Sequence, residues 1–282
     1  MGTSENYAES VMIGMISDDG TQELSLRLAR FPSKDKAHVW LHITDGKTAW
    51  SVVDESFRLT DQQPTSVSDE AVSFSAMSGT QSLSFTSTNR HHPNVFGTVV
   101  GNITADETRA PTAGTGHTPV KLNLGFKSTS AGFRSKNGRW EMTGVVSGKV
   151  DIGGKTFQPN GPGKWHEQTG VRARFAPAFT YLNLQGKDVT LLAIGFKKGT
   201  LGYAILQDQI FAVVDFGIDP SNSDQRKFTA TLDNGDIIEG ITSVTQRWSV
   251  PIKGKVRPGS TVVAETSVGR LVGSLNDWDP DL

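Results

Sequence analysis

Alternating hydrophobic and polar residues run through most of the chain. Leucine occupies every second position at the start of LSLRLARF, residues 24–31, and AHVWLHIT, residues 37–44, has the same alternation. A period of two residues is typical of a β-strand with one buried face. Further segments of this kind are AVSFSAM, QSLSFTS, VKLNLGFKST, RWEMTGVVSGKVDI and, in the second half, FTYLNLQ. Together these patterns predict about a dozen to fifteen short strands.

Turn residues separate these segments and complete the prediction of an all-β fold. DGK at 45–47, GG at 153–154 and DNG at 233–235 are typical of hairpin turns. No long stretch has the 3.6-residue period of an amphipathic helix. One lipocalin-sized barrel uses about eight strands, so the pattern favours two antiparallel barrels or sandwiches in tandem. We place them at residues 1–159 and 160–282, with the seam near 159–163, and read the polar segment 104–118 as a surface loop or lid.

The amino-acid composition excludes several kinds of chemistry and partner. The 282 residues include no cysteine, which excludes disulfides, thiolate metal sites and a cysteine nucleophile. Lysine and arginine number 28 against 29 acidic residues, so the basic excess typical of nucleic-acid binding is missing. We also see no secretory signal in MGTSENYAES and no apolar run of about 20 residues. We therefore expect a cytoplasmic protein with no membrane span and no nucleic-acid partner.

The segment GPGKWHEQTGVRARF, residues 161–175, gathers scarce residue types. In a strand, Trp165 and Glu167 would share one face and His166 the other, whereas a bend at the glycines would let His166 and Glu167 face one cavity. Histidine and a buried glutamate are natural proton donors and acceptors. The alternative is a structural corner in which Trp165 anchors the core.

Two further groups are candidates for binding a ligand. Arg172 and Arg174 alternate along the same segment and could hold a carboxylate or phosphate, or they could lie on a solvated exterior face. His38, Trp40 and His42 share one face of a predicted strand. The two histidines would lie about 13 Å apart, too far to chelate one metal, so we expect an aromatic cavity wall or a half-exposed face.

Several catalytic motifs are missing from the sequence. It has no GxSxG elbow, no GxxxxGK[ST] loop and no HExxH pair. We therefore expect no nucleotide cofactor and no metal. Acid–base chemistry on a small molecule, or simple binding, remains.

A resemblance adds to this interpretation. The run GVVSGKVDIGGKTFQPNGPGKWHEQTG, residues 144–170, has a hairpin with Gly148, Val150, Ile152 and Gly154, and then a glycine-rich bend. This pattern resembles the lipocalin-like superfamily of carotenoid 1,2-hydratases (hydroxyneurosporene synthases) and AttH-like proteins. Many relatives carry Asp-His or Asp-x-x-Trp-Gly in the bend, whereas this chain has WHEQTG, a similar but shuffled polar set.

The resemblance implies two packed lipocalin-like β-barrels, a hydrophobic pocket, and acid–base or pericyclic chemistry on polyene, terpenoid or polyketide-like molecules. It leads us to expect a cofactor-free lyase or isomerase, as a hydratase, dehydratase or cyclase, with a hydrophobic small-molecule substrate. A non-catalytic lipophilic-ligand-binding protein and a structural two-barrel module are the alternatives, and a homodimer is compatible with either. His166 and Glu167 are the predicted acid–base pair. The predicted substrate contacts are Trp40, Trp165, Arg172, Arg174, Phe179 and Tyr181.

Overall fold

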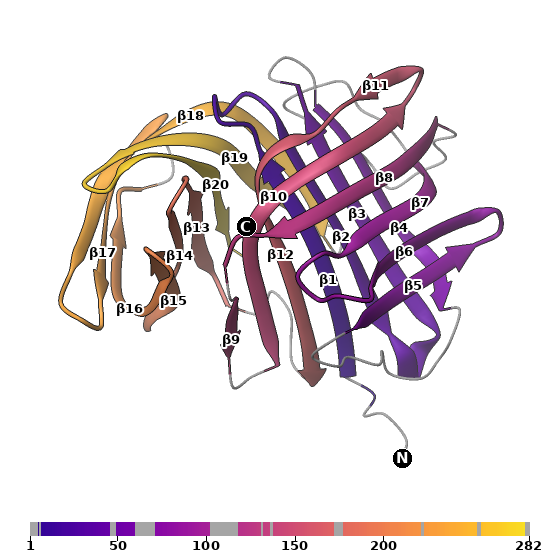
Figure 1. Cartoon of the computed structure of the whole chain (residues 1–282), viewed down its shortest axis with the longest axis horizontal. Helices are drawn as coiled ribbons and strands as arrows, with labels where there is room; N and C mark the ends of the chain where they lie inside the picture. The colour runs from indigo at the N-terminus through magenta and orange to yellow at the C-terminus, as the bar shows by residue number, and fades with distance from the viewer. Residues whose placement is uncertain are drawn as a thin grey trace.

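Two antiparallel β-structures lie side by side in this protein (Figure 1). The structure is a computed structural model. It describes residues 5, 7–45, 49–59, 71–101, 118–130, 132–135, 138–171, 177–220, 223–252 and 255–279. These ranges hold twenty strands, and one 3₁₀ turn at Pro32–Lys34 is their only helical segment. The predicted all-β fold is confirmed, with more strands than the sequence pattern indicated.

The first barrel is built from the strands of the first sheet. Strand β10 pairs with β12 along Arg139–Ser147 and with β8 along Gly144–Ile152, so the sheet closes on itself. The order is β11-β10-β12-β1-β2-β3-β4-β5-β6-β7-β8, and β9 pairs with β10. The strands are β1 Tyr7–Ile16, β2 Glu23–Phe31, β3 Lys36–Thr44, β4 Ala49–Leu59, β5 Val72–Ser78, β6 Gln81–Ser87, β7 Asn94–Gly101, β8 Thr118–Ser128, β9 Phe133–Ser135, β10 Arg139–Ile152, β11 Lys155–Phe157 and β12 Asn160–Val171.

The second barrel is a closed meander of eight strands in sequence order. Each strand pairs with the next, and the pairing of β13 with β20 completes the ring. The strands are β13 Phe179–Gln185, β14 Val189–Phe196, β15 Gly199–Leu206, β16 Gln209–Ile218, β17 Gln225–Leu232, β18 Ile237–Ile252, β19 Lys255–Thr266 and β20 Gly269–Trp278.

Each barrel has its own hydrophobic core, made by the inward face of its strands. In β2, Leu24, Leu26 and Leu28 point into the first barrel, as their alternation predicts. Leu182 and Leu184 of β13 do the same in the second barrel. The two cores fill the barrel interiors, so the outward faces are left to form any surface shared by the two barrels.

The predicted seam at residues 159–163 falls within the first sheet, because β12 pairs with both β1 and β10. The chain leaves the first sheet only after Val171 and enters the second barrel at Phe179. The glycines of this segment serve close packing of strands. A Cβ on Gly163 would lie 2.6 Å from the carbonyl oxygen of Gly14, so a glycine is needed where β12 passes β1.

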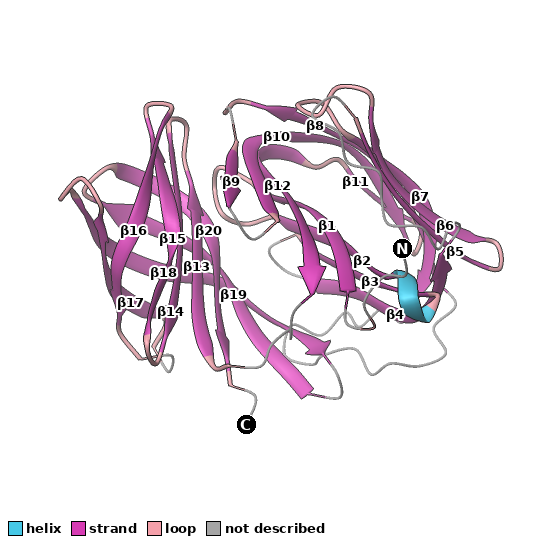
Figure 2. Ribbon diagram, turned by 90° about the horizontal axis from the view of Figure 1, so that it is seen from below, coloured by secondary structure: helices cyan, strands magenta, loops and turns pink. Residues whose placement is uncertain are grey.

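The two barrels lie side by side (Figure 2), and direct contacts join their outer faces. The Thr245 hydroxyl donates to the carbonyl oxygen of Gly20 at 2.7 Å. The ring of Phe133 on β9 stacks on Tyr203 of β15, with ring centroids 4.4 Å apart. No helix in the described ranges is long and apolar enough to cross a membrane.

Candidate active site between the two barrels

A cavity of about 410 Å³ lies between the barrels. Strands β1, β2, β3, β10 and β12 form one wall, and β13, β14, β18 and β20 supply the other. The volume is in the usual range for small-molecule pockets, roughly 300–1,000 Å³. A barrel of this size can hold a small ligand in its interior, but both interiors here are filled by core side chains. The outer faces of the two barrels therefore enclose the cavity.

Strand register assembles the first wall in rows. Glu141 is opposite His166, His166 is opposite Met12, Met12 is opposite Arg27, and Arg27 is opposite Trp40. Cross-strand partners point to the same side of a sheet. Five strands therefore place these five side chains in one row on the outer face.

A second row runs beside the first. Lys164, Gly14, Ser25 and His42 are successive cross-strand partners. A Cβ on Gly14 would meet only ordinary contacts, 3.6 Å from the Leu24 carbonyl oxygen and 3.8 Å from the Met12 methyl carbon. The glycine therefore keeps this part of the cavity wall open.

The facing wall, from the second barrel, carries uncharged polar side chains among apolar ones. Tyr181 is opposite Asn276, and Asn183 is opposite Ser274. Asn183 and Asn276 are buried, and the side-chain oxygen of each has no hydrogen-bond partner among the described residues. Both amides line the cavity, so a ligand can complete the hydrogen bonding of this wall.

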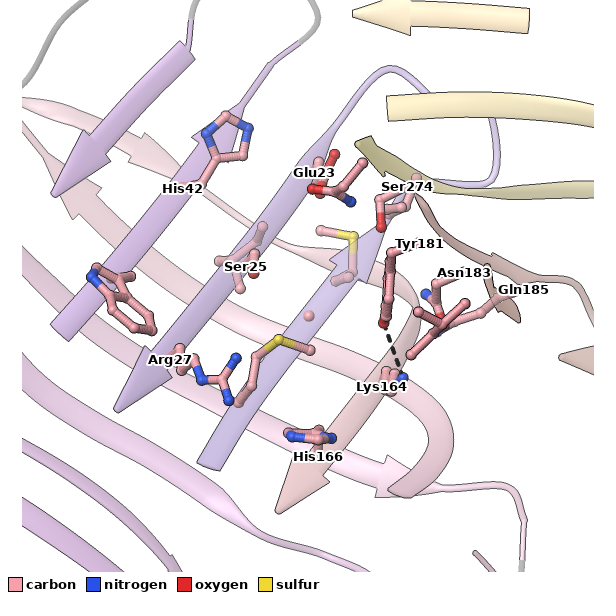
Figure 3. A pocket seen from close by; sticks show the side chains of 18 of the residues that line it. Glu23, Ser25, Arg27, His42, Lys164, His166, Tyr181, Asn183, Gln185 and Ser274 are labelled. Carbon is pink, nitrogen blue, oxygen red and sulfur yellow. Dashed lines mark hydrogen bonds between the residues drawn. The ribbon is translucent and has the colours of Figure 1, made fainter. Parts of the chain in front are cut away.

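A buried charge cluster occupies one end of the cavity. The Oε1 atom of Glu141 lies 2.6 Å from His166 Nδ1, 2.8 Å from Arg139 NH2 and 2.9 Å from Lys164 Nζ. Lys164 Nζ also donates to the Tyr181 hydroxyl at 3.3 Å (Figure 3). All four charged or titratable members of this cluster come from β10 and β12, which are paired strands.

Burial and neighbouring charges set the protonation states of this cluster. Burial raises the Glu141 pKa, but Arg139, Lys164 and His166 together hold that pKa well below its usual value. Burial lowers the His166 pKa to about 3, against the opposing effect of Glu141. Near neutral pH, His166 is therefore a neutral imidazole beside an ionised carboxylate.

The opposite end of the cavity carries a second buried carboxyl, Glu23. It accepts hydrogen bonds from Trp248 Nε1, at 3.1 Å, and from the Thr261 hydroxyl. Burial raises the Glu23 pKa to about 7 despite these two donors. Nearby, His42 lies against the Trp248 ring with centroids 4.8 Å apart, and burial lowers its pKa to about 3.

Several solved structures have an architecture similar to that of this chain. No protein-family model and no curated protein matches the chain. Among solved structures, CghA matches with a TM-score of 0.66 at 8% identity, over 98% of this chain and 89% of that one. Kievitone hydratase from Nectria haematococca gives 0.54 at 9% identity, over 98% and 90%. An AttH-like protein from Nitrosomonas europaea gives 0.56 at 12% identity, over 97% and 92%.

The chain has the lipocalin-like fold of the hydratase and AttH proteins. The match extends over nearly the whole of each chain, so it includes both barrels and the face between them. The resemblance seen in residues 144–170 is therefore confirmed at the level of the fold.

Within this lipocalin-like fold, four of the predicted site residues line the cavity. These are His166, Trp40, Phe179 and Tyr181. His166 and Trp40 come from the first barrel, and Phe179 and Tyr181 come from β13 of the second. Residues that are far apart in the chain are thus brought to one site.

The structure separates His166 from Glu167 and Trp165. Because β12 is a regular strand here, its neighbouring side chains point to opposite faces. Glu167 points into the first barrel, where it accepts hydrogen bonds from Trp165 Nε1, at 2.7 Å, and from Arg90. Trp165 is fully buried in the first core against Phe85 and Phe126. The prediction that Glu167 and Trp165 join His166 in the pocket is wrong for this reason.

The remaining predictions concern Arg172 and Arg174, the segment 104–118 and metal binding. Arg172 and Arg174 lie outside the described residues. The segment 104–118, read as a surface loop or lid, also lies outside them except for Thr118, which begins β8. Among the described residues, no group of three or more His, Asp or Glu side chains could hold a metal ion.

Sequence reasoning missed the carboxylates that matter most at this cavity. Glu141 and Glu23 lie on β10 and β2, far along the chain from His166. Lys164 could have been predicted from the sequence, because it stands two residues before His166 and strand alternation places both on one face. No motif in the sequence pointed to Glu141.

Proposed function

We propose that this protein is an enzyme that acts by acid–base chemistry on a hydrophobic small molecule bound between its barrels. The reaction would be a hydration, a dehydration or a cyclisation. The observation that carries this proposal is the contact between His166, which lines the cavity, and the buried Glu141 beside it, with Nδ1 and Oε1 2.6 Å apart.

This pair has the geometry of a general base and the carboxylate that orients it. The neutral imidazole donates its Nδ1 hydrogen to the ionised Glu141, which fixes the tautomer and leaves the lone pair on Nε2. When Nε2 takes a proton from the substrate, the Glu141 carboxylate stabilises the imidazolium that forms. The three donors on Oε1 keep Glu141 ionised, so the proton stays on His166.

Tyr181 provides a donor for the second half of the reaction. Its oxygen accepts a hydrogen bond from Lys164, so its own hydrogen can point to a ligand. In a dehydration, His166 removes a C–H proton and Tyr181 protonates the departing hydroxyl, which leaves as water. The imidazolium then returns a proton to the phenolate, which restores both groups. Hydration runs through the same steps in reverse.

The relatives in fold support this class of chemistry. One shares its fold with this chain and is named a hydratase, and one structure of CghA contains the small molecule Sch210972. The cavity described above has a volume suited to such a ligand. A non-catalytic binding protein would use the same cavity and would return its ligand unchanged.

A turnover assay tests the proposal. Purified protein is incubated with kievitone and with linear polyene alcohols, and mass spectrometry follows the gain or loss of one water. Turnover should fall roughly 10²–10⁴-fold in His166→Gln and in Tyr181→Phe. His91→Gln, on an exposed turn, is the matched control and should leave the rate unchanged.

The pH profile provides an independent check. Because the His166 pKa is lowered to about 3, the base stays neutral well below pH 6.5. We expect no acidic limb near the ordinary histidine pKa. Equal rates in wild type and His166→Gln would reject the catalytic assignment. Binding without any turnover would instead identify a ligand-binding protein.

A further inference from the structure

Positive charge exceeds negative charge at the His166 end of the cavity. Arg139 and Lys164 both contact Glu141, at 2.8 Å and 2.9 Å. With His166 neutral, two positive charges meet one negative charge, so the cluster carries a net charge of +1. Arg27, in the same row of the sheet, adds a guanidinium that donates to Ser10 Oγ at 2.9 Å.

Lys164 brings this charge to the cavity wall. Its residue is 2% exposed, which makes its ammonium group costly to bury without enough acceptors. An ammonium has three hydrogens, and the structure directs two of them to Glu141 Oε1 and the Tyr181 oxygen. The third is available to a ligand in the cavity that Lys164 lines.

The rest of the cavity has a different character. Apolar side chains also line it, among them Met12, Ile194, Phe179 and Phe196. Glu23 stands four residues along β2 from Arg27, a distance of about 13 Å, and its hydrogen-bond donors among the described residues, Trp248 and Thr261, are neutral. The cavity thus has the cationic groups of Lys164 and Arg27 near His166 (Figure 3) and apolar side chains elsewhere in its lining.

We propose that the cavity binds an organic anion, a carboxylate or an enolate on an apolar body, with its anionic oxygen against Lys164 Nζ and Tyr181 OH. This inference rests on the site of the proposed function and names the class of its ligand. The ligand anion brings the cluster from a net +1 to neutrality. A charged oxygen hydrogen-bonded to an ammonium in a water-poor site is held more strongly than a neutral oxygen.

A matched set of probes tests the proposal without requiring turnover. Naphthylacetate, naphthylethanol and naphthylethylamine share one apolar body and differ in the charge of one end. Their affinities for the wild-type protein are measured by titration calorimetry at about pH 7.5, where the acid is ionised and the amine is protonated. The acid should bind at least about tenfold more tightly than the alcohol, and the amine should bind most weakly.

Two variants should shift this preference in opposite directions. Lys164→Met lowers the charge of the cluster by one and should remove the preference for the acid, with the alcohol changed less than about twofold. Glu141→Gln raises the charge by one and should increase the preference. Circular dichroism establishes that each variant is folded. If Lys164→Met fails to fold, the increase in Glu141→Gln still decides the question.

Gly14→Leu separates the two proposals. The new side chain would extend into the cavity from an unstrained position, so it should abolish binding of all three probes. Equal affinity of acid and alcohol in the wild type overturns the anion proposal and leaves the proposed function standing. If none of the probes binds, or if Gly14→Leu binds them as the wild type does, the cavity is not the ligand site and both proposals fail.

Discussion

Two buried glutamates at opposite ends of one cavity differ in their protonation. Glu141 is 0% exposed and Glu23 is 5% exposed, so burial penalises both charged forms. Glu141 nevertheless has a pKa well below its usual value, whereas the Glu23 pKa is raised to about 7. The partners explain the difference. Arg139 and Lys164 contact the first carboxylate, while an indole and a hydroxyl contact the second.

The comparison shows that neutral hydrogen bonds offset only part of the cost of burying a carboxylate. At Glu141, the two positive charges of Arg139 and Lys164, together with His166, reverse the direction of the pKa shift. Beside the cavity there is therefore one carboxylate, Glu141, that is ionised near neutral pH next to a neutral histidine, and one carboxyl, Glu23, that gains or loses its proton near neutral pH. Substitutions of these groups should separate the two cases.

Removal of Glu141 should have the largest effect. Glu141→Ala leaves Arg139 and Lys164 buried without their shared carboxylate, and we expect a loss of about 3–5 kcal/mol in the free energy of unfolding. Glu23→Ala removes a carboxyl with neutral partners and should cost about 1–3 kcal/mol. Urea unfolding near neutral pH measures both. The exposed Glu239→Ala is the control, with a change within about 0.5 kcal/mol. A loss in Glu23→Ala as large as that in Glu141→Ala would contradict the comparison.

Glu23→Gln should stabilise the protein at high pH. The Glu23 pKa rises from 4.5 to about 7 on folding, so the folded state binds more protons than the unfolded state between these values. The free energy of unfolding of the wild type therefore falls as pH rises through this window. The variant lacks this term and should gain about 1–3 kcal/mol at pH ~8 and nothing at pH ~4.

The measurement for Glu23→Gln is the difference in unfolding free energy between variant and wild type across pH, which cancels the other titrating groups. Glutamine can still accept the hydrogen bond from Trp248. A difference that stays constant from acid to alkaline pH would show that Glu23 does not titrate in this range.

His42→Gln should have a smaller effect, and it should appear at acid pH rather than at high pH. The folded-state His42 pKa is about 3 against an ordinary 6.5, so only the unfolded state takes up a proton as pH falls below 6.5. The stability of the wild type is therefore lost as pH falls through this window. At pH ~5.5 the variant should avoid about 1 kcal/mol of this loss. Thermal melts of both proteins from neutral to acid pH test it, and parallel curves would refute it.

Much of the fold could be predicted from the sequence because a strand with one buried face carries its own signal. Leu24, Leu26 and Leu28 alternate in the chain and point into one core. The strand count was too low partly because β9 and β11 have three residues each, too few to show a period. The seam was misplaced because glycine marks both bends and close strand crossings, and Gly163 is the second kind.

The candidate site was only partly predictable, because strand register is not visible in one sequence. The structure shows that β12 is a regular strand. The alternation in the sequence therefore predicts correctly that His166 points to one face and that Trp165 and Glu167 point to the other. The hydrogen-bonded partner of His166, Glu141, is 25 residues earlier and meets it across β10 and β12. Local pattern identifies the faces of a strand, whereas the pairing of strands decides which faces meet.

The location of the cavity has a consequence for how this protein can change. Its walls are the outer faces of two closed barrels, and each barrel keeps a separate core. Substitutions at Gly14, Ser25 or Ser274 alter the shape offered to a ligand while the packing inside either barrel stays the same. Variant libraries restricted to such positions should yield folded proteins with new ligand preferences, so this architecture is a favourable starting point for directed evolution.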